Sequence, residues 1–288
     1  MRKIDIFNHI WPKPYYEKLL SITGNMTGIT MRSEKVPMIT DLDERFRVMD
    51  MFDDYSQIMT LASPSIEVAA PLSQAVELSR IGSESMAALC AKYPDRFPGF
   101  VASLPMNNTE QLVDEARYAI EQTGACGIQV FSNVAGRPLD HVDFADLFDY
   151  MAEVDLPVWI HPARGADFAD YQTEEKSLYE IWWTFGWPYE TSAAMARLVF
   201  SKTFDRLPGL KVITHHGGGM IPYFEGRVGP GWDQLGARTS DVDYTILLQE
   251  LKKRPLDYFK DFYADTALFG SRMATLGALD FFGADHIL

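Results

Sequence analysis

The chain has 288 residues, enough for one large domain or two small ones, and α/β barrels often occupy this length as a single domain. Its 26 lysines and arginines face 40 aspartates and glutamates, which gives a net charge of −14 with acidic residues spread along the chain. This balance argues against a surface for nucleic acids or anionic membranes, although a few arginines or a metal ion can still hold an acidic ligand in one pocket.

The N-terminus and the cysteines favour a soluble, cytoplasmic protein. Asp5 and Asn8 come before any apolar run that could form a signal-peptide core, and no window reaches the roughly 18 apolar residues of a membrane span. Cys90 and Cys126 lie in apolar contexts far from Cys-x-x-Cys spacing, which is typical of buried, reduced thiols. We therefore expect no nucleic-acid partner and no membrane partner.

Short β-branched runs alternate with amphipathic segments along the chain. The runs predict strands at residues 3–9, 57–62, 99–104, 127–131, 157–161, 211–215 and 262–265, with an eighth beginning at His286. The helical patterns cover residues 42–52, 74–93, 109–122, 144–153, 190–204 and 272–282. This unbroken alternation predicts an α/β fold, a (β/α)8 TIM barrel that forms a single domain over residues 1–288. An open parallel sheet is the alternative.

The predicted barrel has one incomplete edge and two long insertions. Because the chain stops as the eighth strand begins, we expect the natural protein to continue beyond Leu288, unless another chain supplies the last strand. The insertions, at about residues 11–40 and 163–189, follow the carboxyl ends of strands, where barrel loops build active sites. The second insertion is rich in tryptophan, which fits a satellite hydrophobic cluster or a subunit contact as well as it fits a substrate lid.

Histidines and an aspartate stand at the ends of several predicted strands. His215 and His216 follow the strand at 211–215 and precede three glycines, and strand alternation predicts that the two rings lie on opposite faces. His9, His161 and Asp265 end other strands. Because the carboxyl ends of barrel strands converge on one face, imidazoles and a carboxylate placed there suit Zn²⁺ or a similar ion.

Five segments carry a family resemblance, namely residues 4–12 (IDIFNHIWP), 157–162 (PVWIHP), 186–191 (GWPYET), 207–222 (LPGLKVITHHGGGMIP) and 263–266 (YADT). Together they resemble the amidohydrolase-related proteins of the aminocarboxymuconate-semialdehyde decarboxylase type. The resemblance runs from the first strand to the end of the chain, and it is most specific between Gly186 and Arg227.

The resemblance implies a metal site and a catalytic base. His9, His161 and Asp265 would bind a divalent metal, usually zinc, and His216 would be the catalytic acid and base, with His215 as its packing partner. The chain departs from the family at Phe7, which stands where relatives carry the first histidine of His-x-His or, in some, a glutamate. Phenylalanine cannot donate to a metal, so we expect a weaker three-ligand site or an empty one.

Three arginines are candidates for binding a substrate carboxylate. Arg227 matches an arginine that in the decarboxylase reaches the substrate across a dimer interface, which implies a homodimer, and an exposed helix arginine is the alternative. Arg164, after the fifth strand, and Arg32, in the first insertion, are candidates by position alone. An ordinary surface salt bridge is the alternative for Arg32.

The resemblance implies a metal-dependent, non-oxidative decarboxylase that acts on a small unsaturated or aromatic carboxylic acid. The same groups also suit a metal-dependent hydrolase of a lactone, ester or amide, because both reactions use a metal and a general base. The substitution at Phe7 leaves a catalytically silent barrel with a degenerate metal site as a third alternative.

Overall fold

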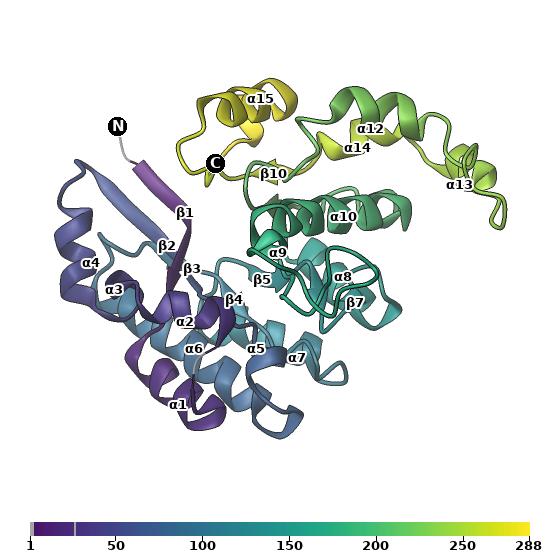
Figure 1. The fold of residues 1–288 in the computed structure, drawn as a ribbon. Coiled ribbons are helices and arrows are strands. Elements are labelled where there is room, and N and C mark those ends of the chain that lie inside the picture. The colour runs from purple at the N-terminus through teal and green to yellow at the C-terminus, as the bar shows by residue number, and fades with distance from the viewer. Residues whose placement is uncertain (1–2, 26) are drawn as a thin grey trace. The chain divides into compact units, whose positions relative to one another are not determined.

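The computed structural model describes residues 3–25 and 27–288 and divides into two compact units (Figure 1). Unit 1 comprises Met1–Gly136 and Leu156–Trp159, and unit 2 comprises Arg137–Asp155 and Ile160–Leu288. None of the helices in the described residues is both long and apolar enough to span a membrane.

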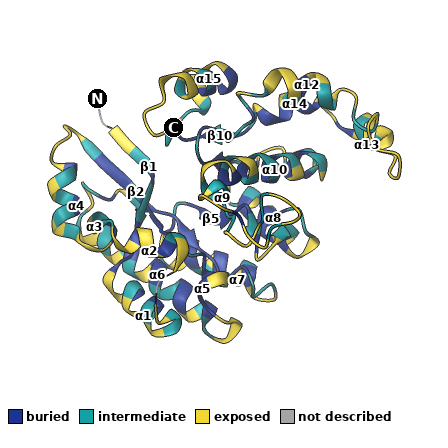
Figure 2. Cartoon of the chain, viewed as in Figure 1, coloured by how far each residue is buried: buried dark blue, intermediate teal, exposed yellow. Residues whose placement is uncertain are grey.

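Two parallel strands form the centre of unit 1. Strand β1 (Lys3–Ile10) pairs with β2 (Tyr55–Leu61), which pairs in turn with β3 (Gly99–Phe100). The sequence of β2 alternates little, and most of its residues are buried (Figure 2), as expected for a parallel strand covered on both faces. The register of β1 against β2 shifts between Asp5 and Asn8, so β1 contains a bulge just before its last residues.

The segment between β1 and β2 is helical. It forms α1 (Lys13–Thr23), α2 (Gly28–Glu34), α3 (Pro37–Thr40) and α4 (Leu42–Met49). Helix α4 starts where it does because the Asp41 side chain accepts hydrogen bonds from the backbone N–H groups of Asp43 and Glu44, at 2.9 and 3.1 Å. The first predicted insertion is therefore folded into short helices.

The long helix α6 (Leu72–Lys92) covers the strands of unit 1. It packs against α1 and against β3 and β4, and its buried residues recur at helical spacing. A Cβ added at Gly82 would lie 2.8 Å from Leu61 and 3.2 Å from Tyr15, so glycine is needed where the helix meets β2 and α1. The remaining elements of unit 1 are α5 (Ile66–Ala69), β4 (Ala102–Ser103), α7 (Leu112–Arg117), the π-helical turn η1 (Tyr118–Gln122), β5 (Ile128–Phe131) and β6 (Asn133–Val134).

Unit 2 combines short parallel strands with helices. Strand β8 (Val158–His161) begins in unit 1 and ends in unit 2, where β9 (Val212–Thr214) pairs in parallel with β10 (Tyr263–Ala264). Its helices are α8 (Ala145–Glu153), α9 (Ile181–Thr184), α10 (Gly186–Phe200), α11 (Thr203–Arg206), α12 (Glu225–Trp232), α13 (Thr245–Glu250), α14 (Pro255–Phe259) and α15 (Arg272–Phe282). The other short elements are β7 (Arg137–Pro138) and the 3₁₀ turns η2 (Val142–Phe144) and η3 (Ala284–His286).

The observed elements confirm an α/β fold with parallel strands. The strand predicted at 99–104 is divided into β3 and β4, and the helix predicted at 190–204 is divided into α10 and α11. At the predicted eighth strand, His286 ends the turn η3, and Ile287 makes a single parallel bridge with Ala264. Within the described ranges the strand pairings do not close a barrel.

Candidate metal centre and acid–base site

A left-handed turn follows β9 and carries both adjacent histidines. The strand ends at Thr214, and His216 has a φ of +55°, which is uncommon for a residue other than glycine. The two imidazole rings of His215 and His216 therefore lie with centroids only 3.8 Å apart. The prediction that they occupy opposite faces is wrong, because strand alternation stops before the pair begins.

The glycines after His216 allow close packing in this turn. All three have positive φ, and a Cβ at Gly218 would lie 2.5 Å from the ring of Phe282. A Cβ at Gly219 would lie 2.6 Å from the backbone oxygen of Pro188 at the start of α10. The turn can therefore place its histidines only if no side chain is present at these positions.

Asp265 follows β10 and contacts His215. One oxygen, Oδ2, meets Nδ1 of His215, and the other accepts hydrogen bonds from the backbone N–H groups of Gly217 and Ala267, at 3.3 and 3.1 Å. Burial raises the pKa of the Asp265 carboxyl to about 6, and the nearby His216 and the backbone donors oppose this effect. Burial lowers the pKa of His215 well below its usual value, so near neutral pH the pair is a neutral imidazole beside a carboxylate.

His161, at the end of β8, lies beside His215. Their rings stack with centroids 5.2 Å apart, and a ring nitrogen of each lies within 4.8 Å of the other. The Nδ1 atom of His161 is 2.8 Å from the carbonyl oxygen of Pro162. Because a carbonyl only accepts, Nδ1 carries the proton and Nε2 carries the lone pair, which is the form that binds a metal.

His216 is half-buried among aromatic rings. Its Nδ1–H donates to the carbonyl oxygen of Ala267 at 2.7 Å, which leaves the lone pair on Nε2. Trp187 of α10 stacks on the ring at a centroid distance of 6.5 Å, and Phe269 lies at 5.5 Å. These contacts fix the orientation of an imidazole whose Nε2 can accept or return a proton.

In unit 1, His9 is held in a similar way. Its Nδ1 is 2.8 Å from the hydroxyl of Thr60, and that hydroxyl donates to the carbonyl oxygen of Asn8 at 3.3 Å. Since Thr60 has one proton to give, His9 donates from Nδ1 and its lone pair is on Nε2. Phe7 lies edge-on to the His9 ring at 5.6 Å and is largely buried.

A buried arginine supports the end of β1. Arg45 of α4 donates to the backbone oxygens of His9 and Met38 and to the side-chain oxygens of Asn8 and Gln57. Burial lowers the pKa of Arg45 to about 10, so the guanidinium is still charged near neutral pH. Sequence reasoning missed this residue because nothing in the pattern of α4 distinguishes it from an exposed helix arginine.

The arginine candidates occupy different environments. Arg164 pairs with Glu190 at 2.9 Å and lies over the ring of Phe168, and its backbone oxygen accepts from the indole N–H of Trp187. Arg227 is exposed on α12, and Arg32 is exposed on α2 in unit 1. The structure therefore places Arg164 beside α10, in contact with Trp187, one of the aromatic neighbours of His216.

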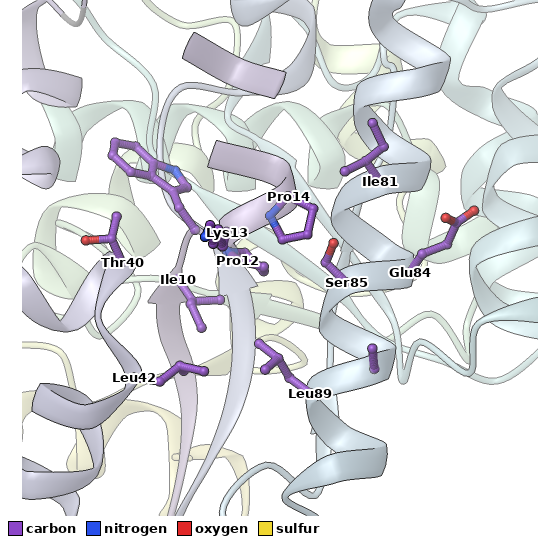
Figure 3. Close-up of a pocket in the computed structure, with 12 residues that line it drawn as sticks. Ile10, Pro12, Lys13, Pro14, Thr40, Leu42, Ile81, Glu84, Ser85 and Leu89 are labelled. Carbon is purple, nitrogen blue, oxygen red and sulfur yellow. The ribbon is translucent and has the colours of Figure 1, made fainter. Parts of the chain in front are cut away.

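Unit 2 thus brings together four of the residues that the sequence singled out, namely His161, His215, His216 and Asp265. Sequence reasoning missed Trp187 and Phe269 as neighbours of His216, although the tryptophan-rich insertion pointed to the first. A separate pocket of about 530 Å³ lies in unit 1 between the end of β1 and helix α6 (Figure 3). The described residues that line it include no histidine or aspartate, so they offer neither the ligands nor the bases of the candidate site.

Comparison with known proteins gives the family. A family model described as Amidohydrolase matches residues 4–288, and the chain belongs to this family. It is 28% identical to the 2-amino-3-carboxymuconate-6-semialdehyde decarboxylase of Dictyostelium discoideum, over 96% of this chain and 80% of the relative. It is 29% identical to the gamma-resorcylate decarboxylase of a Polaromonas species, over 85% of this chain and 74% of the relative.

Solved structures are similar in fold. The 5-carboxyvanillate decarboxylase of Novosphingobium aromaticivorans, complexed with manganese and a nitrobenzoic acid, matches with a TM-score of 0.83 and 23% identity, over 100% of this chain and 85% of that one. A dihydroxybenzoic acid decarboxylase from Polaromonas with bound manganese matches with a TM-score of 0.79 and 25% identity, over 100% of this chain and 85% of that one. The chain is an enzyme of the amidohydrolase family.

Proposed function

We propose that the chain is a metal-dependent, non-oxidative decarboxylase of a small aromatic or unsaturated carboxylic acid. The observation that carries this proposal is the buried group formed by His161, His215 and Asp265 beside His216. The relatives named above are decarboxylases of such acids, which supports the same reaction for this chain.

The donors present fit a divalent metal. His161 offers a lone pair on Nε2, Asp265 is a buried carboxylate, and His9 in unit 1 has the same tautomer as His161. We assign these three residues as ligands, with zinc as the expected ion and manganese as the ion found in similar structures. A bound divalent cation would supply positive charge that holds and polarises the oxygens of the acid.

His216 would handle the proton. In the overall reaction the carbon–carbon bond to the carboxylate breaks, CO₂ leaves, and a proton replaces it on the same carbon. An imidazole held through Nδ1 by Ala267 can first accept a proton on Nε2 from solvent or from a substrate hydroxyl and then deliver it to that carbon. Trp187 and Phe269 fix the ring so that one nitrogen performs both transfers.

Arginines would bind the carboxylate of the substrate. We retain Arg227, Arg164 and Arg32 as candidates, with Arg227 acting across a homodimer. The ion pair with Glu190 gives Arg164 a structural part as well, because it joins the loop after β8 to α10. Guanidinium groups suit this role since they can donate two parallel hydrogen bonds to a carboxylate.

The proposal also includes a closed barrel as the fold of the chain. Structures matching over the whole chain support a single (β/α)8 barrel domain over residues 1–288, with the segments at about 11–40 and 163–189 as active-site loops. In such a barrel, the carboxyl ends of β1, β8, β9 and β10 would present their histidines and Asp265 at the catalytic face. The homodimer and the cytoplasmic location stay predictions.

The test compares decarboxylation with hydrolysis. Purified protein loaded with zinc or manganese is incubated with hydroxybenzoates and muconate-like acids, and CO₂ is measured, while parallel samples receive esters and lactones. The proposal predicts stoichiometric CO₂ release from at least one acid. Cleavage of the esters or lactones without CO₂ release from any acid would assign the chain to the hydrolases.

A further inference from the structure

We propose that His215 is itself a metal ligand, through Nε2, and that Asp265 orients its ring. This inference rests on the proposed metal site and changes one member of its ligand set, with His215 as a ligand in place of Asp265. It assigns a chemical part to a residue that sequence comparison gives only a packing role. It also explains how a site can bind metal although Phe7 stands where the family's usual first ligand would be.

The first support is the position of His215 relative to His161. His161 ends β8 and His215 directly follows β9, its neighbour in the same sheet, and the left-handed turn at His216 holds His215 at the strand end. Their rings stack, and a nitrogen of one lies within 4.8 Å of a nitrogen of the other. Two imidazoles that share a tetrahedral ion place their nitrogens about 3–4 Å apart, because each nitrogen is about 2.0–2.1 Å from the metal.

The second support is the contact between Asp265 and Nδ1 of His215. Metal-binding imidazoles almost always donate their other N–H to a carboxylate or a carbonyl, which fixes the tautomer and leaves Nε2 to bind the ion. His161 satisfies the same rule through Pro162. An acceptor at Nδ1 lies on the far side of the ring from an ion bound at Nε2, so in this arrangement Asp265 positions His215 and does not bind the same ion.

The third support is the chemical contrast between positions 7 and 215. Phe7 packs its ring against His9 and carries no donor atom. His215 carries a donor nitrogen, and its side chain is almost fully buried beside the carboxylate of Asp265. An imidazole directly after β9 would therefore give the proposed site a third nitrogen donor in addition to His9 and His161.

The test counts histidine ligands directly in the whole protein. Protein labelled with ¹⁵N-histidine is titrated with ¹¹³Cd²⁺, and nitrogens that bind the ion show a one-bond coupling to cadmium. With His9, His161 and His215 as ligands, three imidazoles show the coupling. Coupling in only two, with His215 uncoupled, would overturn the inference while the proposed metal site stands. If no metal binds at all, both fail.

Variants provide a second measurement. His215→Ala should weaken zinc binding by about 100-fold or more in a chelator competition, whereas His216→Gln, the matched control, should change it less than about threefold. Adding Phe7→His to His215→Ala should recover at least about tenfold, because it returns a donor to the family's position. Unchanged zinc affinity in a folded His215→Ala protein would contradict the assignment.

Discussion

Each histidine of the candidate site is held through Nδ1, so the lone pair in every case lies on Nε2. His161 is held by a backbone carbonyl, and His216 by another. His9 is held by the hydroxyl of Thr60. Because the tautomer is fixed before a ligand arrives, these imidazoles need no rearrangement to bind a metal or to accept a proton.

The separate roles of His216 and the ligands can be tested by one substitution. His216→Gln should keep the metal and lower kcat by about 10²–10⁴-fold, because only the proton-transfer group is removed. Metal content and CO₂ release are measured on the same sample. Turnover within threefold of wild type would refute the acid–base role of His216.

Thr60 would act on the proposed metal site through His9. Thr60→Val keeps the shape of the side chain but removes the oxygen that accepts from Nδ1 of His9, so metal affinity should fall by about 10-fold or more. Thr239→Val, at an exposed position in unit 2, is the control. Equal zinc affinity for both variants would show that the hydroxyl does not position His9.

Glu67 of α5 makes stability depend on pH. Burial raises the pKa of its carboxyl to about 7, and its Oε1 atom has no hydrogen-bond partner within the described part of the chain. Since the pKa in the unfolded chain is near 4.5, the stabilising effect of the protonated form is complete below 4.5 and is lost as pH rises through 7.

Urea unfolding of wild type and Glu67→Gln measures this effect. The stability advantage of Glu67→Gln should be about 1–3 kcal/mol larger at pH 8 than at pH 5, because the buried charge is absent in the variant. If the difference in stability between the two proteins does not change with pH, burial does not raise the pKa of Glu67 in the folded protein.

At the scale of elements, the strands were the most predictable part. The β-branched runs identified β1, β2, β5, β8, β9 and β10, since a buried parallel strand needs a continuous apolar stretch. Helix α12 was not predicted, because its Gly and Pro residues obscure any helical period. The turn at His216 was missed because no local sequence pattern predicts a histidine with positive φ.

Glycine packing between strands gives an element-scale prediction. A Cβ at Gly127 would lie 2.4 Å from the backbone oxygen of Pro157, so Gly127→Ala must push β5 away from β8. We expect a loss of about 1–3 kcal/mol in the free energy of unfolding. Gly209→Ala, with no atom within 4 Å of the added Cβ, is the control and should change stability much less. Equal effects would contradict this packing.

At the scale of the whole molecule, the motifs at strand ends identified the family, and they pointed to four residues that the structure brings together in unit 2. They could not show that the rings of His215 and His216 lie side by side, because this depends on the turn after β9. They also could not show that Arg45 supports β1, because this depends on contacts between residues far apart in the chain. They also identified Phe7 as a departure, and the structure supplies His215 as a candidate replacement.

The most direct test of the central claim is CO₂ release before and after metal removal. Protein loaded with zinc or manganese is assayed with the hydroxybenzoate and muconate-like acids, stripped with a chelator, and assayed again after one equivalent of metal is returned. The metal-dependent decarboxylase predicts CO₂ release that disappears on stripping and returns on reloading. CO₂ release that survives complete removal of the metal, or its absence from the loaded protein with every acid, would contradict it.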